Sequence, residues 1–406
     1  MRVLIVTQYF EPENFRINDL AKEFARKGYH VDALVGIPNY PSGHYFKGYG
    51  LFKRRSEVVD GVNIYRCFQF PRGAKPGNFR LALNYLSYMF CASFWVLFYF
   101  SFKRKYDAII AFEPSPITSV IPAILLGKIR RTRVLSWILD IWPDSITGNA
   151  SERLRKLLWP PLSWITEIVY KHSDKLLVSS RGMTDLICRE NDYTSKIVYV
   201  PNWSDDFKKV RHDVDVPMPE DTFNLLMAGT LNEGIGVDAV CRFVQELSSN
   251  SDIKIIFLGG GSRKEELECY FKNNNLDNAV VLGQYPYESM PQFYERADAM
   301  LLSLAPTEYK HLDVTVPARL QSYMSAGKPV FAMIGSGATE VITKTQCGFV
   351  VPAGDYMALA DKVKENYRNT ELLNSLGYNA RKAYEQDFTI EAGIKRFEEL
   401  INECCL

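Results

Sequence analysis

The sequence predicts an α/β protein built from two Rossmann-like, doubly wound domains that face a central cleft. Short apolar runs alternate with helical patterns along the 406 residues, as in parallel sheets with helices on both faces. The length exceeds what one hydrophobic core usually serves. The alternation also restarts after Pro201, behind a stretch rich in proline and charge. We therefore expect domains at residues 1–200 and 201–389.

The first domain opens with a strand at residues 2–8. Apolar residues from Ile17 to Ala25 then recur at helical spacing, and Gly28 is placed to end that helix. Further strands are expected at 30–36, 62–68, 108–112, 134–138, 175–178 and 196–200. Helical stretches separate most of these strands, which favours parallel pairing.

The second domain follows a linker at residues 201–222. Its short apolar runs predict strands at 223–228, 253–258, 280–282, 299–304, 329–333 and 348–351. Helical patterns lie between them near 235–249, 262–273, 289–297, 315–326 and 355–367. In such sheets, ligands bind at the carboxyl ends of the strands.

The composition excludes several classes of protein. With 47% hydrophobic and 23% charged residues, the chain is neither disordered nor collagenous. Eight cysteines without a C-x-x-C pair favour a reducing cytoplasm over a disulfide scaffold, and we expect no signal peptide. Five histidines form no H-x-x-x-H pair, so we expect no metal and no cofactor.

The charge is unevenly distributed. Residues 1–200 hold 28 Lys and Arg against 17 Asp and Glu, whereas residues 201–406 hold 20 against 30. This asymmetry suggests that the first half meets an anionic partner. The alternative is an uneven distribution of solvated charge.

One segment, residues 81–102, contains no charge and nine aromatic residues, and it is flanked by Arg80 and by Lys103-Arg104-Lys105. It is long enough to span a bilayer, yet spanning would separate two strands of one sheet. It is either a buried crossover helix or an interfacial helix. The basic flanks and the aromatic content favour peripheral contact of residues 81–105 with a membrane surface.

Two glycine-rich turns follow strands of the second domain. Gly259-Gly260-Gly261-Ser262-Arg263-Lys264 opens a helix, so backbone N–H groups and two cations could hold a diphosphate. The sequence from Gly229 to Gly236, G-T-L-N-E-G-I-G, also joins a strand to a helix. For this second turn, a purely structural role of the glycines in a tight loop is an equally good explanation.

Three further segments carry candidate site residues. Thr315 or Val316 is expected to start a helix with Pro317 in its first turn, and Asp313 and Gln321 would then face the cleft. In the first domain, the candidates follow the first strand or the strand at 134–138, where an acceptor would bind. They are Glu13, Asn14, Arg16, Asp140 and Trp142. Spaced carboxylates at strand ends are also often helix caps.

The chain resembles family 4 glycosyltransferases. The motifs that carry the resemblance are Q-Y-F-E-P-E-N-F-R-I-N-D-L (8–20), P-N-Y-P-S-G (38–43), Gly48-Tyr49, D-I-W-P-D-S (140–145), V-P-N (200–202), G-G-G-S-R-K (259–264) and P-A-R-L-Q-S-Y-M-S-A-G-K-P-V (317–330). Nearly the whole chain is covered. The sequence is most similar to the L-fucosamine transferases of bacterial O-antigen and capsule assembly.

The resemblance implies the GT-B fold, with the acceptor in the first domain, the nucleotide-sugar donor in the second, and a last helix at 390–406 that returns to the first. It also implies retention of anomeric configuration without a metal. Carried over by motif, Arg263, Lys264, Gly229 and the backbone of Thr315 and Val316 would hold the diphosphate. Gln284, Tyr285 and Gln321 would bind the nucleoside, and Asn202 would lie on the acceptor side with Glu13, Arg16 and Trp142. Asp140, Asn14 and Asp313 would be catalytic.

The sequence departs from the family pattern at several positions. Asp313 and Gln321 stand where many relatives carry E-x7-E, and Asn14-Phe15 replaces a common Gly-Gly pair. Leu139 stands where a histidine often precedes Asp140. The cation usual in the turn 229–236 is absent, which places more weight on Arg263 and Lys264.

The expected activity is transfer of N-acetyl-L-fucosamine, or a similar N-acetylated sugar, from a UDP-sugar to a polyprenyl-diphosphate-linked sugar. The protein would act in the cytoplasm, peripherally on the inner membrane, without a nucleic-acid partner. One alternative is a nucleotide-sugar 2-epimerase, which would convert the donor without an acceptor. Another is a non-enzymatic sugar-binding protein, which would bind free sugar without a nucleotide.

Overall fold

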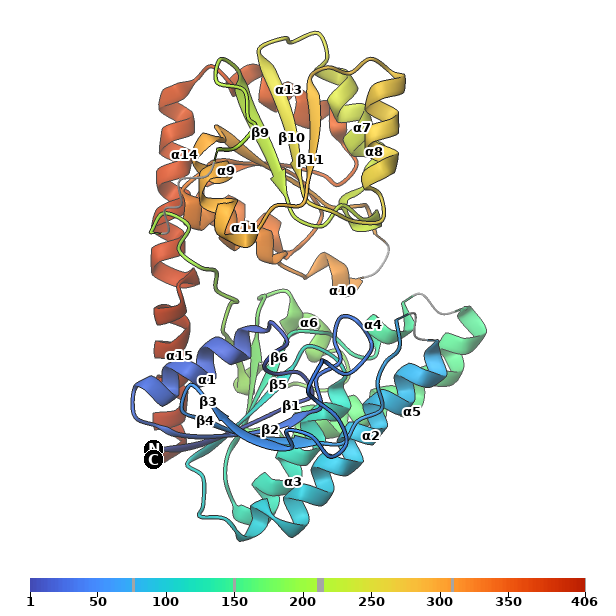
Figure 1. Ribbon diagram of the computed structural model, residues 1–406, viewed down its shortest axis with the longest axis vertical. Helices are drawn as coiled ribbons and strands as arrows, with labels where there is room; N and C mark the ends of the chain where they lie inside the picture. Colours follow the sequence, from blue (N-terminus) through green and yellow to red (C-terminus); the bar gives the residue numbers. More distant parts are fainter. Residues whose placement is uncertain (75–76, 149–150, 210–214, 308–309, 406) are drawn as a thin grey trace. The chain divides into compact units, whose positions relative to one another are not determined.

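The computed structural model describes residues 1–74, 77–148, 151–209, 215–307 and 310–405. By its internal contacts the chain divides into two compact units (Figure 1). Unit 1 contains Met1–Pro201 together with the segment from Gly393 onward, and unit 2 contains Asn202–Ala392. Each unit is a parallel or largely parallel sheet with helices on both faces, which confirms the predicted α/β architecture.

The sheet of unit 1 has eight strands in the order β3-β4-β2-β1-β5-β6-β7-β8. They are β1 (Arg2–Thr7), β2 (His30–Gly36), β3 (Ser56–Val59), β4 (Val62–Cys67), β5 (Ala108–Glu113), β6 (Val134–Ile138), β7 (Lys175–Val178) and β8 (Ile197–Tyr199). Only β3 runs antiparallel, at the edge beside β4. The central strands are buried on both faces, so they are nearly continuous apolar runs.

The helices of unit 1 connect these strands. They are α1 (Arg16–Arg26), α2 (Asn78–Phe98), α3 (Ile121–Arg130), α4 (Asp144–Thr147), α5 (Glu152–His172) and α6 (Met183–Ile187), with 3₁₀ turns η1 (Phe100–Phe102), η2 (Ile117–Val120) and η3 (Thr194–Lys196). The last helix, α15 (Ile390–Cys405), contributes Phe397 to the unit 1 core. The Phe397 ring packs edge-on against Trp137 of β6 at 5.0 Å, and both side chains are fully buried.

The sheet of unit 2 has six parallel strands in the order β11-β10-β9-β12-β13-β14. They are β9 (Phe223–Ala228), β10 (Ile253–Leu258), β11 (Ala279–Gly283), β12 (Ala299–Ser303), β13 (Val330–Met333) and β14 (Gly348–Val351). The strand order reverses between β9 and β12. Ligands of doubly wound sheets bind beyond the carboxyl ends of the strands at such a reversal.

The helices of unit 2 cover both faces of its sheet. They are α7 (Val237–Glu246), α8 (Lys264–Asn273), α9 (Met290–Arg296), α10 (Lys310–Asp313), α11 (Ala318–Ala326), α12 (Gly337–Thr345), α13 (Tyr356–Asn366) and α14 (Thr370–Ala383), with turns η4 (Glu233–Ile235), η5 (Tyr287–Ser289) and the π-helical η6 (Tyr384–Phe388).

Helix α11 begins later than the sequence predicts. Its N-cap is Pro317, so Thr315 and Val316 lie outside the helix. A proline disfavours the helical conformation of the residue before it, which explains why the helix does not start at Val316. The prediction that these two residues form the first turn of this helix is wrong.

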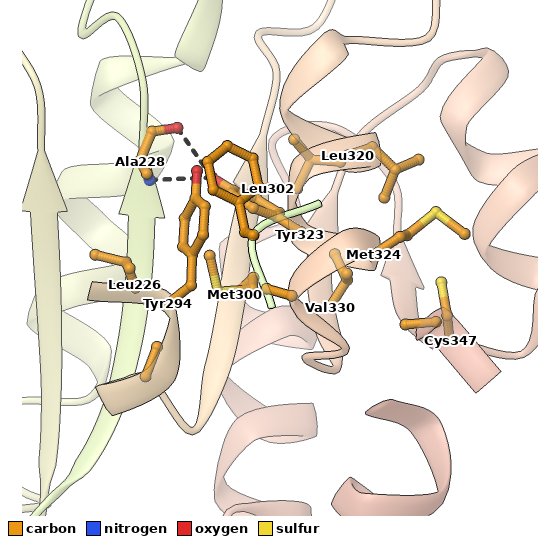
Figure 2. Close-up of a cluster of buried hydrophobic side chains, with 14 of the residues drawn as sticks. Leu226, Ala228, Tyr294, Met300, Leu302, Leu320, Tyr323, Met324, Val330 and Cys347 are labelled. Carbon is orange, nitrogen blue, oxygen red and sulfur yellow. Dashed lines mark hydrogen bonds between the residues drawn. The ribbon is translucent and has the colours of Figure 1, made fainter. Parts of the chain in front are cut away.

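Tyr323 fixes α11 to the centre of the unit 2 sheet (Figure 2). Its side chain is fully buried among Leu226, Met300 and Leu320, and its hydroxyl accepts a hydrogen bond from the backbone N–H of Ala228 (3.0 Å). The hydroxyl also lies 3.1 Å from the carbonyl oxygen of Ala228, which can accept its proton. A polar tip anchored at the last residue of β9 sets the position of α11 along that strand.

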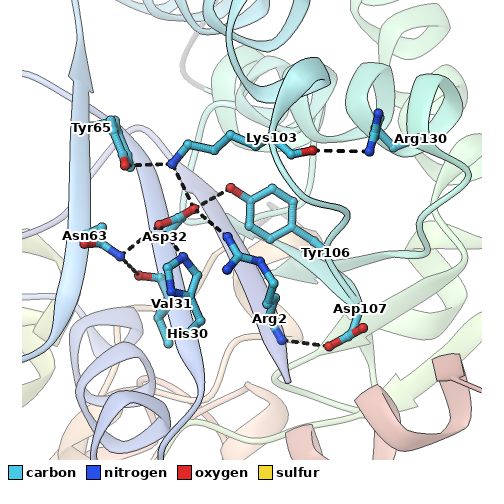
Figure 3. A network of polar contacts seen from close by, with 10 residues as sticks. All are labelled: Arg2, His30, Val31, Asp32, Asn63, Tyr65, Lys103, Tyr106, Asp107 and Arg130. Carbon is cyan, nitrogen blue, oxygen red and sulfur yellow. Dashed lines mark hydrogen bonds and ion pairs between the residues drawn. The ribbon is translucent and has the colours of Figure 1, made fainter.

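Asp32 of β2 is a fully buried carboxylate at the centre of a polar network in unit 1 (Figure 3). It accepts hydrogen bonds from Tyr106 (2.5 Å) and Lys103 (3.1 Å) and lies near His30 and Arg2. Burial alone would raise the pKa of Asp32, but Tyr106 and the charge of Lys103 outweigh it and hold the pKa below its usual value.

Helix α2 packs on the unit 1 sheet with one side only. Asn84, Tyr88 and Ala92 are buried, and the Tyr88 hydroxyl donates to the carbonyl of Leu34. Asn78–Phe102 is long and apolar enough to cross a membrane. Unlike the core helix of a soluble protein, it is largely uncovered, since only 28% of its apolar 18-residue stretch is buried. Its outer side is an aromatic and aliphatic stripe, spaced about four residues apart. We call this the aromatic stripe: Phe79, Leu86, Phe90, Phe94, Leu97, Phe98 and Phe102.

Candidate functional site

A pocket of about 210 Å³ lies at the carboxyl ends of the neighbouring strands β9, β10 and β11 of unit 2. The residue that follows each strand contributes to it. Its lining consists of Gly229, Thr230, Leu258, Gly259, Gly260, Gln284, Tyr285 and Met290. We call it the switch-point pocket, because it begins at β9, where the strand order reverses.

The glycines of this pocket allow two backbone turns to touch. Gly259 has φ +147°, and a Cβ atom there would lie 1.9 Å from the carbonyl oxygen of Gly229. A Cβ atom on Gly261 would similarly lie 2.1 Å from the oxygen of Leu231, whose N–H donates to Gly260. The two glycine-rich turns singled out in the sequence are therefore one structure, and their glycines are required by close packing.

Arg319 supplies a cation beside this pocket. It lies one helical turn before Tyr323 on the same side of α11, and that tyrosine is anchored at Ala228. The Arg319 guanidinium consequently reaches Gly229, the residue that follows Ala228. A Cβ atom built on Gly229 would lie 3.5 Å from the Cζ atom of Arg319. Its Nη1 is buried and has no hydrogen-bond partner among the residues that the structure describes.

Arg263 and Lys264 stand beside the same turn, but carboxylates engage both. The Arg263 guanidinium pairs with Glu233 and, at 2.5 Å, with Glu266, and Lys264 pairs with Glu268 at 3.2 Å. Neither cation lines the switch-point pocket. For Arg263 to reach a phosphate there, its guanidinium would have to leave two carboxylates.

The predicted residues near α11 are not gathered at the pocket. Gln321 is buried, and in the amide orientation that satisfies its nitrogen it donates to the carbonyls of Pro317 (3.1 Å) and Ala318 (3.0 Å). Thr315 donates to the carbonyl of His311, and Val316 packs against the core. Asp313 is exposed at the end of α10.

The carboxyl edge of the unit 1 sheet carries a cluster of aromatic side chains. The Tyr9 ring, after β1, stacks on Phe15 at 5.2 Å and meets Tyr40, after β2, at 5.7 Å. Arg72, after β4, donates to the Tyr9 hydroxyl (3.1 Å), and its Cζ lies over the Tyr40 ring. Four rings and one guanidinium thus share this edge, since the Cζ of Arg72 also lies 6.0 Å from the centre of the Tyr85 ring.

The predicted residues of unit 1 border this cluster in different roles. Trp142 is buried beside Tyr85 and donates from Nε1 to Ser115 (3.1 Å). Glu13 is also buried and accepts hydrogen bonds from the backbone N–H groups of Phe10, Asn39 and Tyr40.

Glu13 therefore ties two loops together instead of facing solvent. Burial raises its pKa to about 7, although the three N–H groups oppose that rise. By contrast, Asn14 is exposed, and Arg16 at the start of α1 pairs with Asp19 at 3.2 Å.

Asp140 follows β6 and is half-buried next to a second carboxyl group, Glu113 at the end of β5. Burial, and secondly the charge of Asp140, raise the pKa of Glu113 well above its usual value. Two carboxyl groups thus lie at the ends of adjacent strands, and the deeper one, Glu113, holds its proton more tightly than an ordinary glutamate. Asn202 is the first residue of unit 2 and is half-buried.

The sequence alone did not single out Arg319, Arg72 or Glu113. The motif P-A-R-L-Q contains Arg319, but only the anchoring of Tyr323 shows which side of α11 faces β9. Arg72 lies in a loop after β4, and it contacts Tyr40 because β4 and β2 are neighbours in the sheet although they are not consecutive in the sequence. Glu113 is the last residue of an otherwise apolar strand, and a carboxyl group at that position could have been recognised from the sequence as a candidate site residue. Across the described residues, no group of three or more His, Cys, Asp or Glu is placed to hold a metal.

Comparison with known proteins identifies this architecture. A family model described as "Glycosyl transferase 4-like domain" matches residues 14–203, and one described as "Glycosyl transferases group 1" matches residues 209–383. The chain is therefore a glycosyltransferase with the GT-B fold. Together the two matches cover most of the chain and support the family 4 glycosyltransferase that the sequence motifs predicted. The comparisons do not test the L-fucosamine subgroup.

Individual relatives agree with this family. The amylovoran biosynthesis glycosyltransferase AmsK of Erwinia amylovora is 28% identical over 128 residues, which are 31% of this chain and 30% of AmsK. The O-antigen chain mannosyltransferase C of Escherichia coli is 22% identical over 155 residues, 38% of this chain and 41% of the enzyme. The chain thus spans less than half of the length of these relatives.

A solved structure shows the same fold over nearly the whole length. The structure of Anabaena HepE in complex with UDP covers 99% of this chain and 100% of its own, with a TM-score of 0.65 and 15% identity. At that identity, the likeness supports the fold alone.

Proposed function

We propose that this enzyme transfers a sugar from a UDP-sugar to a lipid-diphosphate-linked acceptor in bacterial surface polysaccharide synthesis. The reaction proceeds with retention of configuration and without a metal. The transferred sugar is N-acetyl-L-fucosamine or a similar N-acetylated sugar. The polysaccharide context draws on the relatives AmsK and O-antigen chain mannosyltransferase C.

The observation that carries the proposal is the switch-point pocket with Arg319 beside it. The pocket lies where doubly wound sheets bind nucleotides, its glycines admit a close ligand, and Arg319 offers a buried, unpaired N–H. A diphosphate would satisfy this donor by a charge-assisted hydrogen bond. We place the base near Gln284 and Tyr285, which form the outer wall after β11.

The chemistry follows from these charges. The bond between the anomeric carbon and the UDP oxygen breaks while the acceptor hydroxyl forms the new glycosidic bond and passes its proton to the leaving diphosphate. Negative charge grows on the leaving diphosphate, and Arg319 stabilises it from a position already fixed by Tyr323. Arg263 and Lys264 contribute further positive charge if the nucleotide displaces their carboxylate partners.

We assign acceptor binding to the cluster of aromatic side chains at the carboxyl edge of the unit 1 sheet, which we call the aromatic edge. Tyr9, Phe15 and Tyr40 offer apolar ring faces, and Arg72 offers a cation for a phosphate-bearing acceptor. Asp140 lies beside the buried carboxyl group of Glu113, whose pKa is raised by burial and by the charge of Asp140, and we assign Asp140 to the reacting centre. Asn14 and Asp313 join this proposal from their family positions alone.

A lipid-linked acceptor also requires contact with a membrane, which we assign to the aromatic stripe of α2. Phe79 is 84% exposed and Phe102 is 81% exposed, far more than large apolar residues usually are in a soluble protein. Aromatic side chains favour the interface between headgroups and acyl chains. Because the opposite side of α2 is bound to the sheet, this contact is peripheral and does not span the membrane.

Thermal unfolding with added ligands tests the donor assignment. We expect UDP to raise the unfolding temperature with or without Mg²⁺, and GDP, NAD and free sugars to leave it unchanged. Stabilisation by free sugar alone would favour the non-enzymatic binder, and no shift with any nucleotide would refute the donor site. Conversion of a UDP-sugar without an acceptor would favour the 2-epimerase.

Vesicle binding tests the membrane contact separately. Replacing exposed Phe90 and Phe94 by serine is expected to release the protein from phosphatidylcholine vesicles without changing the UDP-dependent shift. The matched substitution Phe52→Ser removes another exposed ring of unit 1 outside the stripe and should leave vesicle binding intact. Equal binding by all three proteins would contradict the assignment.

A further inference from the structure

A second concave surface lies at the amino end of the unit 1 sheet, opposite the aromatic edge. Its volume is about 500 Å³, and it is formed where β6, β7 and β8 begin and where α3 and α5 end. We call it the basic pocket. Its charged lining consists of Lys128, Arg131, Arg133, Lys171, Lys196 and one carboxylate, Asp174.

Some of these charges already have structural partners. Lys196 donates to the carbonyls of Tyr170, Lys171 and Ser173 at the end of α5, and Asp174 accepts from the N–H of Val134. In the described part of the chain, no carboxylate forms an ion pair with Lys128, Arg131 or Lys171. Three cations of the basic pocket are thus available to a ligand.

The simplest alternative is that the cations only neutralise the ends of α3 and α5. A helix carries roughly half a negative charge at its carboxyl end, so two helices supply about one. Asp174 supplies one more. The five cations that line the pocket therefore exceed the local negative charge by about three, and helix ends alone do not account for them.

Arg131 gives a second, independent observation. It ends α3 in the left-handed conformation, with φ +49° and ψ +50°. Glycine or asparagine is favoured at such a position because a Cβ atom is strained there. Arg131 is exposed, lines the basic pocket with four other cations, and forms no ion pair within the described part of the chain, so its strained position supports a role in binding a ligand.

The end of α3 connects the basic pocket to the end of the aromatic stripe. Arg130, at the end of α3, donates to the carbonyls of Ser101 (2.8 Å) and Lys103 (3.2 Å), which locks α3 to the end of α2 (Figure 3). Phe102 and Ile129, which lie next to these contacts in the chain, are 81% and 45% exposed. Exposed apolar groups and unpaired cations therefore meet at one end of unit 1.

We infer that the basic pocket binds the phosphate of an anionic phospholipid headgroup while the aromatic stripe enters the same membrane surface. The inference rests on the proposed membrane contact and adds a lipid specificity to it. The occupant is a bilayer lipid, since Phe102 and Ile129 give it an apolar neighbour that a free phosphate would not need. A juxtamembrane Lys or Arg near an anionic surface strengthens binding about fivefold.

The test uses the full chain with the variant Lys128→Ala/Arg131→Gly. The glycine relieves the strained backbone, so the variant should fold at least as stably as the wild type. We expect its binding to vesicles of equal phosphatidylglycerol and phosphatidylcholine to weaken about 25-fold, with binding to phosphatidylcholine alone unchanged. The control Lys272→Ala/Lys382→Ala removes two exposed cations of unit 2 and should bind like the wild type.

Each other outcome overturns the inference in a distinct way. Unchanged binding of the Lys128/Arg131 variant, or of Lys171→Ala as a second variant, excludes the pocket. Equal binding of the wild type to both vesicles excludes lipid specificity but keeps the membrane contact. Full displacement of the protein from mixed vesicles by millimolar inorganic phosphate would identify a free phosphate ligand. The UDP-dependent thermal shift of every variant should persist, which separates this test from the donor assignment.

Discussion

The guanidinium of Arg319 lies against Gly229, so that a methyl group on this glycine would come within 3.5 Å of Cζ. The two residues are 90 positions apart in the sequence, and Tyr323 brings them together by bonding to Ala228. The contact places a cation, whose Nη1 has no partner among the described residues, at the strand end where the donor diphosphate is proposed to bind.

Replacing Arg319 should therefore weaken nucleotide binding. Loss of a charge-assisted hydrogen bond of about 1.5–3 kcal/mol predicts a fall in UDP affinity of about 10–100-fold for Arg319→Ala. Isothermal titration with UDP measures this change. Arg263→Ala is the matched control, because that guanidinium is already paired with Glu233 and Glu266. The opposite ranking of the two variants would return the main diphosphate role to Arg263.

Gly259→Ala is expected to disrupt the contact between the two glycine-rich turns. Its Cβ would lie 1.9 Å from a backbone oxygen at a residue with φ +147°, so we expect a loss of about 2–4 kcal/mol and of UDP binding. Gly260→Ala is the control, because its Cβ would meet only the movable Gln284 amide at 2.8 Å. Urea unfolding of both variants measures the difference, and equal losses would contradict the packing argument.

Asp32→Asn should destabilise unit 1 by about 3–5 kcal/mol at neutral pH, because it leaves Lys103 and Tyr106 facing an amide. The folded-state pKa of Asp32 is lowered, so its contribution is present above the ordinary pKa of 3.8 and is lost as pH falls through the folded value. The wild type and variant should therefore converge in acid. Tryptophan fluorescence reports mainly on unit 1, which holds Trp95, Trp137, Trp142, Trp159 and Trp164.

An exposed ion pair supplies the control for that experiment. Glu152 and Lys156 on α5 are 81% and 76% exposed, so Glu152→Gln should change the stability by less than about 1 kcal/mol at any pH. If Asp32→Asn matched this small effect, the buried network would not be an important source of stability.

The contribution of Glu13 to the free energy of unfolding should depend on pH in the opposite direction. Its pKa is raised from 4.5 to about 7, so the folded chain binds the proton more tightly than the unfolded chain. The resulting stabilisation is complete below pH 4.5 and is lost as pH rises through 7, by about 3 kcal/mol in total. Glu13→Gln should remove this slope, so the stability difference between wild type and variant should change between pH 5 and 8. Parallel pH profiles would show that Glu13 does not titrate in this way.

The elements that a local pattern determines were predicted well. Strand β2 occupies residues 30–36 as predicted, because Val31, Ala33, Leu34 and Val35 are apolar and the strand is buried on both faces. The edge strand β3 was missed, since Ser56–Val59 is a short segment of exposed and half-buried residues that pairs with β4 at the edge of the sheet. Helices α12 and α14 were also missed. The start of α11 was misplaced because the effect of Pro317 on Val316 outweighed the helical pattern.

The site was predicted only as far as sequence neighbours define it. Both glycine-rich turns and Gln284-Tyr285 follow adjacent parallel strands, and the structure gathers them into one pocket. Their roles in binding and catalysis stay predictions. Arg319 and Arg72 could not be found in this way, since each acts through a partner far along the chain. Conversely, Gln321 looked available on its helix, yet its amide turns back to Pro317 and Ala318.

The packing of Phe397 against Trp137 has a consequence for biosynthesis. Unit 1 fills its core with a residue that is synthesised after all of unit 2. A ribosome adding about 5–20 residues per second needs roughly 10–40 s to travel from the end of the first segment to this phenylalanine. During that interval a nascent unit 1 leaves a hydrophobic surface at Trp137 open to other proteins. The enzyme therefore depends on chaperones, or on the speed of translation, more than a chain whose domains are each contiguous.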